Sequence, residues 1–170
     1  MTVKPAMPGW LKLLLAGMAA GLVIVGIGLL LNRGSQVRLD GSVLKVRTVA
    51  TDTSASVLVV DLRLKNPARA LFWVKEVTVS IVDASGKLVE GQTVAEPDLD
   101  RVLTYYPLTG PRYNPTLKVR DKIRRDESCD RTVAAAFAVG EKEVLGRRKL
   151  VVRIVDADGV VVEIAEGAGK

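Results

Sequence analysis

The chain has 170 residues and a formal net charge of +6; 48% of its residues are hydrophobic and 26% are charged. It contains no histidine, which excludes His-based catalytic triads, His general bases and the commonest metal ligand of proteins. Its single cysteine, Cys129, excludes an internal disulfide and a Cys-x-x-Cys metal clamp. The length suits one compact domain with an appendage and is too short for two full-sized domains.

The first predicted element is a transmembrane helix over residues 13–31, preceded by a tail of residues 1–12. The segment LLLAGMAAGLVIVGIGLLL contains no charged side chain. At about 1.5 Å per residue it spans about 28 Å, close to the ~30 Å hydrocarbon core of a bilayer. The alternative is a cleaved secretory signal, whose apolar run is about 7–15 residues long and ends in a small-x-small site. Here the run is longer and ends in Leu31-Asn32-Arg33, which favours an uncleaved anchor.

Positive charges stand on both sides of this segment. Lys4 and Lys12 precede it and Arg33 and Arg38 follow it, so the positive-inside comparison is nearly level. A short tail before a larger domain favours a cytoplasmic N-terminus. We therefore expect a single-pass protein of the cell (inner) membrane, with its C-terminal domain on the extracytoplasmic side.

Gly17, Gly21 and Gly28 fall on one stripe of the predicted helix. Small residues on one face let a second helix approach closely, so these three are candidate membrane-helix packing residues. The alternative explanation is that glycine is simply common in membrane helices.

The rest of the chain divides into a linker of residues 32–36, a domain of residues 37–166 and a C-terminal tail of residues 167–170. In the domain, short segments of alternating apolar and polar residues are separated by Gly, Pro, Asn and Asp. The predicted strands are 44–49, 57–65, 77–81, 88–94, 117–123, 133–139, 150–154 and 160–164. We therefore predict an all-β fold: an antiparallel Ig-like β-sandwich of about eight strands, preceded by one N-terminal transmembrane helix.

The clearest strand is 57–65. Its even-numbered residues from Leu58 to Leu64 are all apolar, whereas Asp61, Arg63 and Lys65 are charged. This alternation predicts one face on a core and the other in water. Segment 132–139 is less clear, because its alanines also suit a helix. The surroundings favour a strand buried on both faces.

Two segments, Val79–Glu90 and Val152–Glu163, are identical at eight of twelve positions. Each contains a D-A-[SD]-G motif between two apolar runs, in which Gly supplies the positive φ of a tight hairpin turn. We interpret both as β-hairpins that share turn chemistry, rather than as a duplication.

The residues Val60-Asp-Leu-Arg-Leu-Lys-Asn66-Pro67 resemble the strand-then-Asn-Pro element of the water-stress WHy (late-embryogenesis-abundant type 2) domains. The hairpin IVDASGKLVEG is similar to those of bacterial membrane-anchored Ig-like β-sandwich proteins of unassigned role. The resemblance covers residues 56–94. It implies an Ig-like sandwich without catalytic residues, used for binding or protection.

Segment Glu96–Pro115 is predicted to be a long ordered loop, with all three tyrosines and four of the seven prolines of the chain. Prolines stiffen a loop, and tyrosines offer rigid contact area at low entropic cost. The candidate partner-binding residues are Tyr105, Tyr106, Tyr113, Arg112, Lys118, Arg120 and Lys122. The alternative is that the tyrosines cover the open end of the sandwich and bury their rings there.

Three other clusters, one acidic, one aromatic and one basic, have mainly structural interpretations. Without a companion nucleophile or a phosphate cradle, Glu96, Asp98 and Asp100 are expected to be solvated. The aromatic cluster 71–73 is expected in the core, although aromatics at a membrane-proximal rim would touch lipid. The basic residues of 112–131 are either a solvated strand face or a surface that attracts anionic headgroups or an acidic protein.

Together these features predict a non-enzymatic, membrane-anchored binding or scaffold protein, with no catalytic residue, cofactor or metal site. The expected partners are the lipid bilayer and a protein, in a homo-oligomer or a membrane complex; nucleic acid is not expected, because the chain has no dense basic face. The alternatives are an accessory subunit of a larger membrane complex and a WHy-like stress-protection protein.

Overall fold

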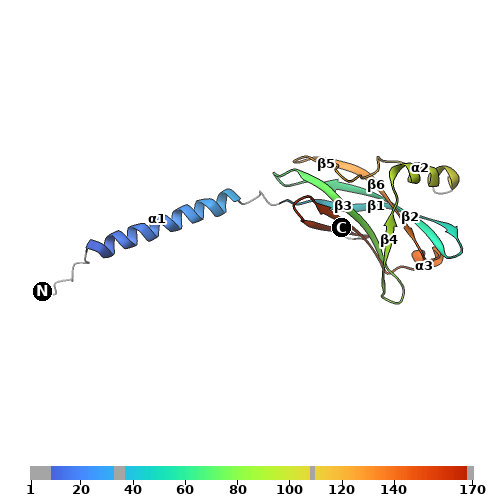
Figure 1. Ribbon diagram of the computed structural model, residues 1–170, viewed down its shortest axis with the longest axis horizontal. Helices are drawn as coiled ribbons and strands as arrows, with labels where there is room; N and C mark the ends of the chain where they lie inside the picture. The colour runs from blue at the N-terminus through green and yellow to red at the C-terminus, as the bar shows by residue number, and fades with distance from the viewer. Residues whose placement is uncertain (1–8, 33–36, 108–109, 168–170) are drawn as a thin grey trace. The chain divides into compact units, whose positions relative to one another are not determined.

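The computed structural model describes residues 9–32, 37–107 and 110–167, and the chain divides into two compact units, Met1–Gln36 and Val37–Lys170. The first unit contains helix α1 (Gly9–Asn32) (Figure 1). Among the helices of the described ranges, none has both the length and the apolar character that a bilayer crossing requires. Most of the predicted tails and linker lies outside the described residues, as do the surroundings of Gly28.

The described part of the second unit contains eight strands and two helices. They are, in chain order, β1 (Asp40–Asp52), β2 (Ala55–Lys65), β3 (Phe72–Val82), β4 (Leu88–Thr93), α2 (Glu96–Tyr105), β5 (Lys122–Ile123), β6 (Ser128–Phe137), α3 (Glu141–Leu145), β7 (Lys149–Asp156) and β8 (Val161–Ala165). The strand order is β1-β2-β6-β4-β3-β7-β8, with β5 paired to β3, and these strand pairs are antiparallel. The prediction of an antiparallel β fold is confirmed in this coarse form, as a curled sheet consistent with a β-sandwich.

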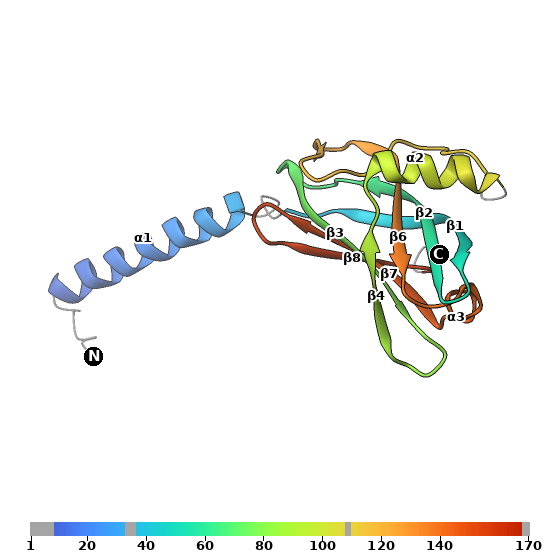
Figure 2. The ribbon, with the colours of Figure 1, turned by 45° about the vertical axis from the view of Figure 1, so that its right-hand side comes forward.

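Strand β4 joins the two layers of the sheet, because its first four residues pair with β3 and its last two pair with β6. The sheet curls so far that β1 and β8 lie against each other, with Gly41 beside Ile164 (Figure 2). At the crossing, a Cβ on Gly91 would lie 2.6 Å from Cζ of Phe137, closer than carbon atoms approach. A glycine at position 91 therefore lets β4 pass over the Phe137 ring.

The main core lies between the layers and is built by the predicted alternation. Leu58, Val60, Leu62 and Leu64 of β2 face the apolar residues of β3 and β7. The segment with ambiguous composition, 132–139, forms most of β6, so the preference for a strand is confirmed. The strand conformation is favoured over a helix because Ala134 and Ala135 are both fully buried, one on each face of the sheet.

Both predicted hairpins are confirmed. Gly86 and Gly159 have φ of 94° and 83°. In the first turn the carboxylate of Asp83 accepts the N–H groups of Ser85 and Lys87 at 2.8 and 2.9 Å. The Ser85 hydroxyl, together with these N–H groups, lowers the pKa of Asp83, since hydrogen bonds to a carboxylate favour its charged form. Each motif is therefore a local structure that the sequence specifies by itself.

Two predictions about elements are wrong. Of the strand predicted over 117–123, only Lys122–Ile123 is a strand, because Arg120 has a φ of 75° and turns the chain. Residues Glu96–Tyr105, predicted as a loop, form α2. Pro97 lies in the first helical turn, where an N–H has no partner within the helix, so its absence loses no hydrogen bond. Two acidic residues in the same turn interact favourably with the positive end of the helix dipole.

Candidate functional site

Helix α2 covers the face of β2 and β6 that points away from the main core (Figure 2). Leu99, which is fully buried, belongs to a second small core with Val57, Val59 and Ala134. As a result, β2 is buried on both faces from Ser56 to Leu62. This part of the strand therefore has no face in water, contrary to the alternation argument.

Asp61 is the charged residue on this covered face, and the prediction that it lies in water is wrong. Its carboxylate accepts hydrogen bonds from Nη2 of Arg47 at 2.9 Å and from the hydroxyl of Thr132 at 2.5 Å. The amide of Asn114 lies 3.4 Å from the same carboxylate. Arg47 and Asp61 are only 8% and 3% exposed, so this is a buried ion pair. The only signal in the sequence was one acid inside an otherwise apolar run.

The segment after α2 lies over this ion pair. Nη1 of Arg47 donates to the carbonyl oxygen of Pro111 at 2.9 Å. The ring of Tyr113 has Nζ of Lys45 at 4.9 Å and Cζ of Arg47 at 5.0 Å from its centroid, which are cation–π distances. Tyr113, a predicted partner-binding residue, therefore contacts strand β1 of its own chain.

Glu96 at the start of α2 binds two of the predicted partner-binding residues. Its carboxylate forms an ion pair with Arg112 at 2.8 Å and another with Lys118. Arg112 also lies 3.3 Å from Asp100. The hydrogen bond from Lys118, followed by the charges of Lys118 and Arg112, lowers the pKa of Glu96. The expectation of a solvated carboxylate is therefore wrong for Glu96, whose partners come from the segment after α2, whereas the side chain of Asp100 is 53% exposed.

We expect Glu96→Gln to destabilise the protein at pH 7 and to have no effect at strongly acidic pH. Because the folded-state pKa is lowered, the carboxylate contributes stability above its unfolded-state pKa. That contribution disappears as the pH falls through the folded-state pKa. Urea unfolding of both full-length chains across this pH range measures the difference. Glu90→Gln, at an exposed position of β4, is the control, and a Glu96→Gln effect independent of pH would contradict the assignment.

Tyr105 and Tyr106 lie at the C-terminal end of α2. Their rings form an edge-to-face pair with centroids 5.0 Å apart. Tyr105 is 78% exposed, so the alternative in which it buries its ring at home does not apply to it. Beside it is a hollow of about 490 Å³, lined by Asp100, Arg101, Thr104 and Tyr105. This end of α2 therefore presents aromatic surface next to charged side chains.

Arg120 and Lys122 lie at the other end of the second unit, where β5 pairs with the start of β3 (Figures 1 and 2). Nζ of Lys122 is 5.1 Å from the centroid of the Trp73 ring. Trp73 is 41% exposed and Leu71 is 44% exposed, so of cluster 71–73 only Phe72 belongs to the core, and the expectation is wrong for its neighbours. The seven candidate residues thus fall into four places rather than one surface.

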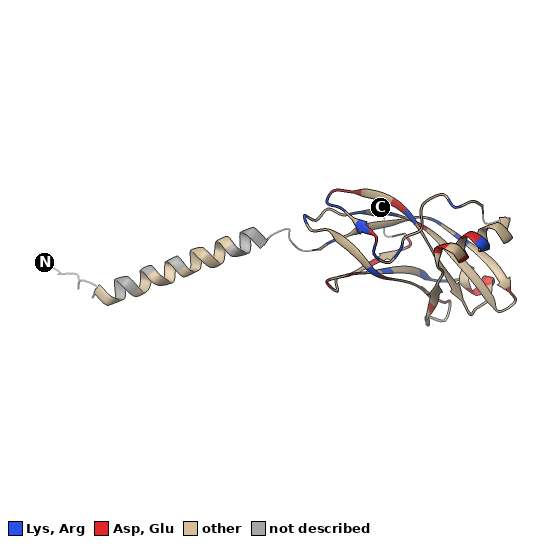
Figure 3. Ribbon diagram, turned by 45° about the horizontal axis from the view of Figure 1, so that its top comes forward, with Lys and Arg blue, Asp and Glu red and all other residues tan. Residues whose placement is uncertain are grey.

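The remaining reactive groups offer no clear site. Cys129 is partly buried in β6, and burial raises the pKa of its thiol, which disfavours the reactive thiolate. Over the described residues, no three Cys, Asp or Glu side chains are placed to hold a metal ion together. Residues of both charge signs are spread over the strands and loops of the second unit (Figure 3).

Comparison with known proteins yields structural similarity only. No protein-family model matches the chain, and no curated protein matches it. An uncharacterised β-sandwich protein from Clostridium difficile is similar in structure, with 8% identity, a TM-score of 0.38 and coverage of 77% of this chain and 89% of its own. A Northeast Structural Genomics Consortium target is also similar, with 9% identity, a TM-score of 0.35 and coverage of 80% and 84%. Neither similarity identifies a function.

Proposed function

We propose that this protein is a non-enzymatic, single-pass membrane protein that displays an Ig-like β-sandwich on the extracytoplasmic side and binds a protein partner there. The anchor is assigned from the sequence, to the uncharged segment 13–31, whose length suits the hydrocarbon core of a bilayer. Small residues such as Gly17 and Gly21 on one face of this segment let a neighbouring helix approach closely. The partner is thus a second copy of the chain or a subunit of a membrane complex.

The observation that carries the proposal is the exposed Tyr105 on a helix held firmly from its other side. Leu99 fixes α2 to β2 and β6, and Arg112 ties its first turn to the following segment. An aromatic side chain on such a support loses little conformational entropy on binding. Exposed tyrosine and arginine, here Tyr105 and Arg101, are also residue types enriched at the centres of protein interfaces.

The test is photo-crosslinking of the full-length chain in its native membranes, with a benzophenone amino acid in place of Tyr105. We expect one adduct of defined mass, which identifies the partner as a second copy or as another protein. The same probe at Leu88, which is 62% exposed in β4, is the control and should give no such adduct. With the partner identified, Tyr105→Ala should weaken binding by about 30-fold, as expected for loss of an interface hot spot.

Two results would contradict the proposal. Release of the chain from membranes by alkaline carbonate would show that segment 13–31 is not an anchor. The protein could instead stay in the membrane but give the same adducts from positions 105 and 88, or no adduct from position 105. Either result would show that this end of α2 is not the binding surface.

A further inference from the structure

One end of the second unit combines exposed apolar side chains with basic ones. We call this end the basic tip: it consists of Leu71, Trp73, Lys75, Val119, Arg120, Lys122, Arg124 and Arg125. We propose that the basic tip binds the surface of an anionic lipid bilayer, so that the domain lies on the membrane rather than swinging freely from its anchor. The inference rests on the proposed anchoring and adds a lipid contact made by the domain itself.

Hydrogen bonds fix the backbone of Trp73 at the tip. The N–H of Trp73 donates to Oδ1 of the buried Asp156 at 2.6 Å, and its carbonyl accepts the N–H of Ala157 at 2.9 Å. Trp73, which is 41% exposed, is thus carried on a paired strand, and Val119 next to it is 59% exposed. Tryptophan among cationic side chains is the composition that proteins place at membrane interfaces.

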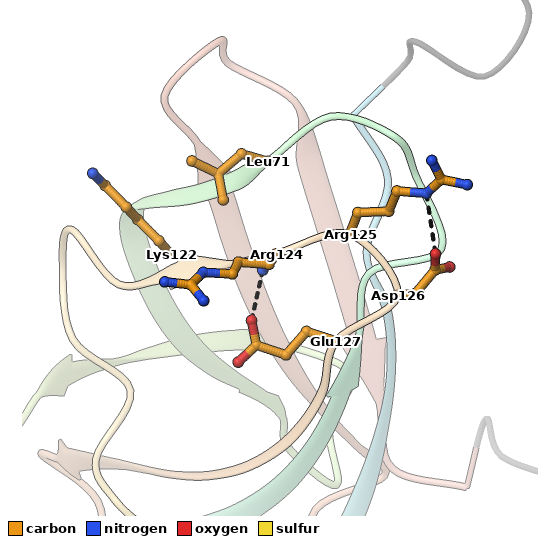
Figure 4. Close-up of a pocket in the computed structure, with 6 residues that line it drawn as sticks. All are labelled: Leu71, Lys122, Arg124, Arg125, Asp126 and Glu127. Atoms are coloured by element: carbon orange, nitrogen blue, oxygen red, sulfur yellow. Dashed lines mark hydrogen bonds and ion pairs between the residues drawn. The ribbon is translucent and has the colours of Figure 1, made fainter.

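The basic side chains surround these apolar residues. A hollow of about 560 Å³ is lined by Leu71, Lys122, Arg124, Arg125, Asp126 and Glu127 (Figure 4). Asp126 pairs with Arg125, and Glu127 accepts the backbone N–H of Arg124 at 2.7 Å, so both acids of this hollow bind groups of their own loop. A second hollow, of about 300 Å³, lies on the Trp73 side and includes Lys75 and Arg120 in its lining.

The charge balance of the tip favours an anionic surface. Segments 65–76 and 118–127 contain eight Lys or Arg residues and four Asp or Glu residues, a local net charge of +4. The neighbouring turn adds the buried Asp156 and the exposed Asp158. Each basic residue near an anionic leaflet strengthens binding by about five-fold, so a few exposed Lys and Arg side chains suffice for a stable contact.

The basic tip lies at the end of the second unit where the chain enters it. The chain enters the second unit at Val37, and the first residue of β1, Asp40, pairs with Lys65 at the end of β2. After Lys65, the loop of residues 66–71 leads directly to the tip residues Leu71 and Trp73. In the sequence, only residues 32–36 separate the apolar segment from Val37, and five residues extend over about 18 Å at most. An anchor at 13–31 would therefore hold this end, rather than the Tyr105 end, within reach of headgroups.

Fluorescence of Trp73 tests the proposal. The chain has two tryptophans, so Trp10→Phe leaves Trp73 as the single reporter in the full-length protein. The protein is reconstituted into phosphatidylcholine vesicles with or without one-third phosphatidylglycerol, with brominated acyl chains as quenchers. We expect a blue shift and strong quenching of Trp73 in the anionic vesicles, and reversal of both by high salt.

Charge reversal supplies the matched comparison. Lys122→Glu with Arg124→Glu should abolish the shift and the quenching, whereas Lys87→Glu with Lys142→Glu, exposed positions away from the tip, should leave both unchanged. Unquenched Trp73 in anionic vesicles, or equal quenching in both vesicle types, would overturn the proposal. Alkaline extraction of the same vesicles separates this outcome from failure of the anchor, because an embedded protein with an unquenched Trp73 refutes only the lipid contact.

Discussion

Replacing Arg47 with methionine should lower the free energy of unfolding by about 3–5 kcal/mol, because it leaves a buried charge without its partner. The change leaves the Asp61 carboxylate in a site that is almost closed to water, with hydrogen bonds from Thr132 and Asn114 but no cation. It also removes the link between β1 and the carbonyl of Pro111. Urea unfolding of the full-length chain in detergent, followed through Trp73 in the Trp10→Phe background, measures the loss.

The matched control is Arg63→Met, which breaks an ion pair of similar length between β2 and its other neighbour, β6. Arg63 binds Asp130 at 2.8 Å, but its side chain is 56% exposed, so water compensates the loss and the change in stability should be much smaller than for Arg47→Met. Combining Arg47→Met with Asp61→Leu should recover part of the stability, because no buried charge then lacks its partner. Equal costs for Arg47→Met and Arg63→Met would contradict the buried ion pair.

Leu99→Ala should cost about 2–5 kcal/mol, since a fully buried leucine leaves a cavity between α2 and the sheet. The loss should be accompanied by faster hydrogen exchange along α2, because Leu99 is its fully buried contact with β2 and β6. It should also reduce the crosslinking yield at position 105, if the helix is the support of the binding surface. Unfolding and exchange measurements on the full-length chain test the first two effects.

Leu145→Ala provides the comparison for a helical leucine outside the core. Leu145 ends α3 and is 61% exposed, so we expect a change within about 0.5 kcal/mol and no effect on the exchange of α2. A loss below about 1 kcal/mol for Leu99→Ala would show that α2 is not held by this residue.

What sequence patterns can and cannot indicate is visible in β2. The alternation from Leu58 to Leu64 correctly predicted the residues of the main core. It said nothing of a second cover on the other face, because a strand's periodicity records only that one face is apolar. Whether Asp61 meets water or Arg47 depends on α2 and residues 110–116, which are distant in sequence.

Helix α2 shows a different limit. Its signals were present in Pro97 at the start and in the helical spacing of Leu99, Val102 and Leu103, but the prolines and tyrosines around them favoured a loop. The ten-residue helix is short for an isolated helix in water and depends on packing against the sheet. Its identity as a helix was therefore settled by contacts that local propensity does not contain.

Residues close in sequence determined much of this protein by themselves: the uncharged segment 13–31, the alternating strands, and the two D-A-[SD]-G turns with their positive-φ glycines. These depend on side-chain periodicity and on interactions over a few residues. The tertiary structure alone decided that Glu96 binds Arg112 and Lys118, that Asp61 is buried, and that the tyrosine end and the basic tip are separate surfaces. Ion pairs and the exposure of a side chain depend on which segments fold against each other. Patterns over a few neighbouring residues do not contain that information.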